Sequence, residues 1–83
     1  MSSREVGLYG SAKFSEVFNT HFTEEGLDQI EEYAAEYGDD EVMTAIDIAC
    51  DKYETAIEAW LRISGILYNR RRVREKYLED DAE

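Results

Sequence analysis

The stretch DDEVMTAIDIAC, residues 39–50, has the clearest helical pattern in this 83-residue chain. Its apolar residues recur at i, i+3, i+4 and i+7, which places them on one face of a helix: these are Val42, Ala45, Ile46 and Ala49. Asp39 is suited to cap this helix, and the two acids that follow it suit the positive end of the helix dipole. The segment therefore predicts a buried helix, in which Cys50 is a small core residue.

The same periodicity continues outward on both sides of this helix. Apolar residues recur at helical spacing in three further segments, 14–22, 27–37 and 56–67. Thr23 and Thr55 are suited to cap the second and the last helix, and Gly38 to end the second. No segment shows the alternation of a strand. The sequence therefore predicts an all-α fold, a compact bundle of about four helices with a basic C-terminal helix.

The length of the chain indicates a single domain. We expect a loose N-terminal lead-in over residues 1–10, a single helical domain over 11–78 and a frayed acidic tail over 79–83. Gly65 lies inside the apolar pattern of the last helix. Because a helical glycine costs about 1 kcal/mol relative to alanine, it suggests close helix packing or a bend.

Charge is divided sharply along the chain. Residues 16–58 contain fourteen acids and one base, whereas residues 62–76 contain six bases and one acid. The six bases are the candidate nucleic-acid-binding residues: Arg62, Arg70, Arg71, Arg72, Arg74 and Lys76. Forked arginine donors suit phosphate oxygens, and the acidic body would repel a polyanion elsewhere. The alternative is an exposed helix end whose cations offset the helix dipole and pair with the acidic body.

The acidic body itself admits two interpretations. One is an ordinary solvated outer face. The other is a mimic of the DNA phosphate array that blocks a basic DNA-binding protein. The run Asp39-Asp40-Glu41 lacks the alternating oxygen ligands of a calcium loop, so no metal site is predicted.

No motif in the sequence supports catalysis. His21 is the only histidine, and no serine or cysteine partner is placed near it by a motif, so we expect a surface or partly packed imidazole. We predict no enzyme activity, no catalytic residue, no cofactor and no small-molecule substrate. The single cysteine favours the cytoplasm, and no apolar run approaches the roughly 20 residues that span a bilayer, so we expect no membrane partner.

Three segments, in order, resemble the C-terminal DnaD-like domain of primosome and phage replication proteins. They are Phe18-Asn19 with Phe22, YGDDEVMTAIDIA at 37–49 and RISGILYNR at 62–70. The resemblance covers roughly residues 14–72. It implies a helical domain that contacts DNA through its last helix, self-associates and works with the helicase-loading machinery. Arg62 and Arg70 replace the two aromatic residues of the family's motif, which leaves phosphate contact open but removes aromatic stacking there.

Our leading hypothesis is a non-enzymatic DNA-binding and assembly module in replication initiation. Its expected partners are single- or double-stranded DNA, a helicase loader and further copies of itself. The main alternative is an acidic inhibitor or adaptor that binds a basic host protein, for example as a DNA mimic. A purely structural interaction domain with helices shared across an oligomer is the third.

Overall fold

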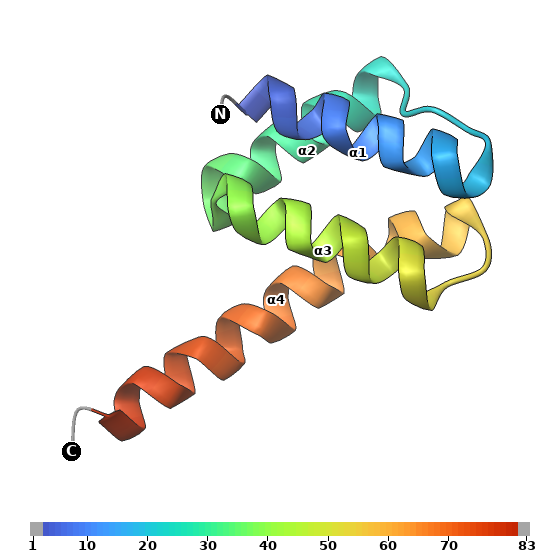
Figure 1. Cartoon of the computed structure of the whole chain (residues 1–83). Helices are drawn as coiled ribbons and strands as arrows, with labels where there is room; N and C mark the ends of the chain where they lie inside the picture. Colours follow the sequence, from blue (N-terminus) through green and yellow to red (C-terminus); the bar gives the residue numbers. More distant parts are fainter. Residues whose placement is uncertain (1–2, 82–83) are drawn as a thin grey trace.

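The structure is a computed structural model that describes residues 3–81, with side chains from Arg4 to Lys76. Within that range it contains no strand and four α-helices: α1 (Ser3–Phe18), α2 (Glu24–Tyr37), α3 (Asp39–Lys52) and α4 (Ala56–Asp81). The first three helices and the N-terminal half of α4 form a body, and the rest of α4 projects beyond it (Figure 1). The predicted all-α bundle of about four helices, with a basic C-terminal helix, is confirmed.

Residues 3–10 are not the loose lead-in that the sequence suggested, and residues 1–2 lie outside the described part of the chain. Helix α1 begins at Ser3, and Val6 is fully buried. Gly10 is a packing residue: a Cβ there would lie 2.7 Å from Cε2 of Phe22 and 2.8 Å from Cδ1 of Ile46. The absence of a side chain at Gly10 therefore allows α1 to approach the core closely. In the sequence alone, a glycine that close packing requires looks the same as a glycine that marks a loop.

The acidic tail, expected to fray from residue 79, is also helical where the structure describes it. Helix α4 continues through Asp81, so the boundary predicted at residue 79 is wrong for the backbone of residues 79–81. Residues 82–83 lie outside the described part of the chain. Helix α4 passes through Gly65 without interruption, and no atom lies within 4 Å of a Cβ built there. The close packing within the chain expected at this glycine is therefore absent.

Local capping signals explain where three of the helices begin. The Thr23 hydroxyl accepts a hydrogen bond from the Gly26 backbone N–H at 3.1 Å, and the Thr55 hydroxyl accepts one from the Glu58 N–H at 3.2 Å. Asp39 is not a cap, because it is already the first residue of α3. Gly38 takes that place with φ 98°, a left-handed conformation that favours glycine.

The core lies between the four helices and is almost entirely aliphatic. Aromatic rings close one end of it: Phe22 follows α1 and folds back, with its ring centroid 4.7 Å from Phe14 and 5.1 Å from Trp60. Its backbone N–H donates to the Ser11 hydroxyl at 3.1 Å. Val17, expected on the inner face, is 45% exposed. The buried apolar residues are Val6, Phe14, Ile30, Ala34, Val42, Ala45, Ile46, Ala49, Cys50, Ala59, Ile63 and Leu67.

A polar contact joins α1 to α3 at the edge of this core. The Tyr9 hydroxyl donates to Oδ1 of Asp47 at 2.6 Å. This bond to a carboxylate, together with burial, raises the pKa of Tyr9 to about 12. Tyr9 therefore remains a neutral donor at physiological pH.

Candidate nucleic-acid interface

Arg70 forms an ion pair with another residue of the same chain. Its Nε donates to Oε2 of Glu41 at 2.9 Å, and its Nη2 donates to Oε1 at 3.3 Å. This bond lowers the pKa of Glu41 and raises that of Arg70. A guanidinium that donates two hydrogen bonds to one carboxylate is a poor candidate for a phosphate contact through that edge, because the pair must first be broken.

Arg71 is also held by the body. Its Nη2 donates to the backbone carbonyl of Glu36 at 2.6 Å, and its Nη1 lies 3.5 Å from Oε1 of the same residue. The guanidinium also lies 4.0 Å from the ring centroid of Tyr37, a cation–π distance. Arg70 and Arg71 therefore fasten α4 to the adjacent ends of α2 and α3. For these two residues the structure favours the interpretation that the bases pair with the acidic body.

The other four predicted bases remain exposed. Arg62, Arg72, Arg74 and Lys76 have no hydrogen bond or ion pair within the described residues, and Arg72 lies 6.0 Å from the Tyr68 ring. With 100° of rotation per residue about the helix axis, three of these bases project within an arc of about 80° on the side of α4 that is turned away from the body. They are Arg62, Arg72 and Lys76. We call these three the outward bases. Arg74 lies one turn beyond Arg70 and is near enough to Glu41 to help lower its pKa.

A shallow hollow lies beside the outward bases on α4, lined by Asn69, Arg72, Val73, Glu75 and Lys76. Tyr68 is 55% exposed, so its ring is available for stacking. Trp60 is partly buried against the core.

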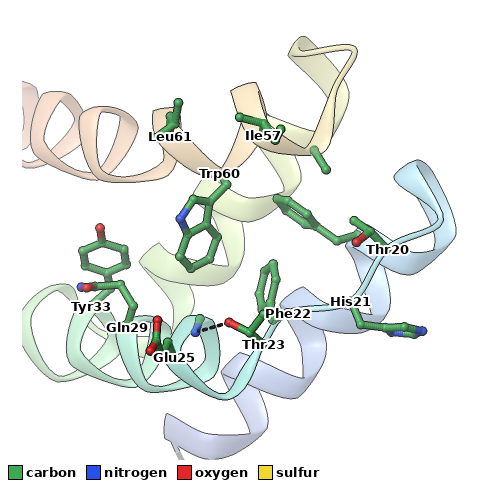
Figure 2. A pocket seen from close by; sticks show the side chains of 13 residues that line it. Thr20, His21, Phe22, Thr23, Glu25, Gln29, Tyr33, Ile57, Trp60 and Leu61 are labelled. Atoms are coloured by element: carbon green, nitrogen blue, oxygen red, sulfur yellow. Dashed lines mark hydrogen bonds between the residues drawn. The ribbon is translucent and has the colours of Figure 1, made fainter.

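A second hollow, of about 500 Å³, lies between α2, the start of α4 and the connection at residues 19–23. Trp60 and Phe22 point into it, and Ile57 and Leu61 of α4 also line it (Figure 2). Glu25 and Gln29 are on the α2 side. Apolar and polar side chains line this hollow together. No local sequence pattern reveals it, because its walls come from segments far apart in the chain.

The remaining candidates for chemistry do not assemble into a reactive site. His21 is exposed, and Cys50 is buried with its pKa raised to about 11 by that burial. Among the described residues no group of three or more His, Cys, Asp or Glu side chains could hold a metal ion. Most of the acids on α2 and α3 face solvent. The described helices include none that is long and apolar enough to cross a bilayer.

Comparison of the chain with protein-family models, curated proteins and solved structures found no match. The resemblance to the DnaD-like domain therefore stays a hypothesis that depends on the quoted motifs.

Proposed function

We propose that this protein is a non-enzymatic DNA-binding and assembly module whose phosphate contacts come from the outward bases of α4. The observation that supports this most directly is that Arg62, Arg72 and Lys76 share the side of α4 that faces away from the body. Arg74 is a secondary contact on another side of the helix. A role in replication initiation, alongside a helicase loader, depends on the motif resemblance alone.

The electrostatics predict weak, oriented binding. The net charge of −11 repels a polyanion from the body, but the Debye length is only about 8 Å at physiological salt, so a projecting helix is partly screened from it. Phosphate contacts release counterions and carry little sequence information. We therefore expect little sequence preference, with Tyr68 adding some preference for unpaired bases through stacking.

The experiment is a fluorescence-anisotropy titration with a labelled single strand and a labelled duplex. Three phosphate contacts predict a loss of roughly 40-fold in duplex affinity between about 50 and 200 mM salt. Absence of binding at low salt would contradict the proposal. Binding that is insensitive to salt would contradict the role of the outward bases.

One observation favours a second candidate function, an adaptor that binds a basic protein. The hollow beside Trp60 combines an apolar floor with the exposed carboxylate of Glu25, which suits an apolar side chain flanked by a cation. Affinity capture with the intact protein and with a Glu25→Lys variant tests it. A basic partner that high salt releases, and that the variant fails to retain, would support the adaptor.

A further inference from the structure

Helix α4 has an exposed apolar strip that the body does not cover. Ile57 is 76% exposed, Leu61 67% and Tyr68 55%. Together with Ser64 they are spaced by four, three and four residues, the spacing of a helix–helix seam. We call these four residues the seam. The body contacts α4 through the other side, where Ala59, Ile63 and Leu67 are buried.

The two ends of the seam have opposite charge. Exposed Glu58 lies beside its N-terminal end, and exposed Arg72 lies beside its C-terminal end. Both are seven residues from Gly65, and all three lie on the same edge of the seam. If two copies of α4 align antiparallel about Gly65, each Glu58 meets the other copy's Arg72 and each Leu61 lies near the other copy's Tyr68. A parallel alignment would instead place like charges together, which is unfavourable.

We propose that a second copy of this chain docks antiparallel along the seam and forms a two-fold symmetric dimer. A self-complementary patch is what an isologous interface requires. Aligned about Gly65, the two copies of α4 overlap over residues 56–74, a contact about 28 Å long at 1.5 Å per residue. Gly65 and Ser64 at the centre allow the two helices to approach closely, since no atom lies within 4 Å of a Cβ at Gly65.

The dimer gives Gly65 the packing role that it lacks within one chain. It also has a geometric consequence. The two-fold axis is perpendicular to both helices, so Arg62 and Lys76 of both copies lie on the same side of the pair. The dimer shares Tyr68 and Arg72 with the proposed DNA contacts. The seam nevertheless follows from exposure, spacing and charge alone, so the dimer can be tested in the absence of DNA.

The first test is sedimentation equilibrium of the intact protein over a wide concentration range. We expect a dimer whose dissociation constant rises at least about tenfold in Leu61→Ser, since each copy loses buried apolar area. Leu8→Ser is the matched control, because Leu8 is 54% exposed on α1 and lies off the seam. A monomer at every concentration, or a dimer that Leu61→Ser leaves unchanged, would overturn the proposal.

Charge reversal then tests the antiparallel alignment. Glu58→Arg and Arg72→Glu should each weaken the dimer, because each variant brings like charges together. The double variant should regain most of the lost affinity, since it restores opposite charges with the positions exchanged. Both residues are exposed, and far-UV circular dichroism checks that every variant keeps its helix content. A double variant that dimerises no better than the single ones would rule out this pairing.

Discussion

Arg70 on α4 and Glu41 on α3 form a two-pronged ion pair where α4 leaves the body, with donor–acceptor distances of 2.9 and 3.3 Å. The pair uses a residue that the charge pattern assigned to phosphate binding. It also fixes the direction in which the rest of α4 projects. The basic segment is therefore divided between two roles: the first arginines of the run anchor the helix, and the outward bases remain available to a partner.

Replacing Glu41 by Gln should cost about 0.5–1 kcal/mol of stability at pH 7, the range of a well-formed surface pair. Folding lowers the pKa of Glu41. Its contribution is therefore complete above the unfolded-state pKa and is lost as the pH falls through the folded-state pKa. Urea denaturation of both proteins at about pH 7 and pH 3 should show a difference that is smaller in acid. Asp40→Asn is the control, since Asp40 is exposed; an Asp40→Asn loss as large as that of Glu41→Gln would contradict the pairing.

Local features of the fold could be predicted from the sequence. The periodicity of the α3 segment, the caps at Thr23 and Thr55 and the burial of Cys50 all depend on residues close together in the chain. Such signals can be recognised without knowledge of the tertiary structure. The start of α1 was missed because Gly7 and Gly10 favour a loop locally, whereas here the close approach of Phe22 and Ile46 requires a glycine at position 10.

The candidate site was harder to predict because it depends on contacts between residues far apart in the chain. The run of bases identified the right segment, but the partners of Arg70 and Arg71 lie 29 and 35 residues away. Nothing local to the run distinguishes an anchoring arginine from a free one. The exposed seam was also missed, because an apolar residue on a helix signals burial unless the direction of the core is known.

The division of roles within the basic run predicts different effects for two double variants. Arg72→Ala with Lys76→Ala should weaken DNA binding and reduce the slope of affinity against salt by about 2. Arg70→Ala with Arg71→Ala removes the same charge but should lower stability and change the salt slope much less. Anisotropy titrations and urea denaturation of both variants test this. Equal changes in salt slope would show that the internal ion pairs open on binding.

Two glycine variants should change stability in opposite directions. Gly10→Ala forces a Cβ to within 3 Å of both Phe22 and Ile46, so we expect a loss of about 1–3 kcal/mol from overpacking. Gly65→Ala meets no atom within 4 Å and should gain up to about 1 kcal/mol from helix propensity. Thermal or urea denaturation at low protein concentration measures both without a contribution from self-association. A neutral Gly10→Ala would mean that α1 can shift away from the core at little cost.

Cys50 provides a probe of how often the body opens. It is 5% exposed, and burial raises its pKa to about 11 from an ordinary value of 9.0. Because the thiolate is the reactive form, a thiol reagent at pH 8 should label the native protein far more slowly than the urea-unfolded chain. If labelling proceeds through opening, its rate should rise with pH only until the unfolded-state thiol has ionised, near pH 9, and then level off. A rate that keeps rising toward pH 11 would show reaction from the folded state instead. Gly10→Ala should accelerate labelling by the factor by which it raises the unfolding constant, whereas exposed Leu8→Ser should leave the rate almost unchanged.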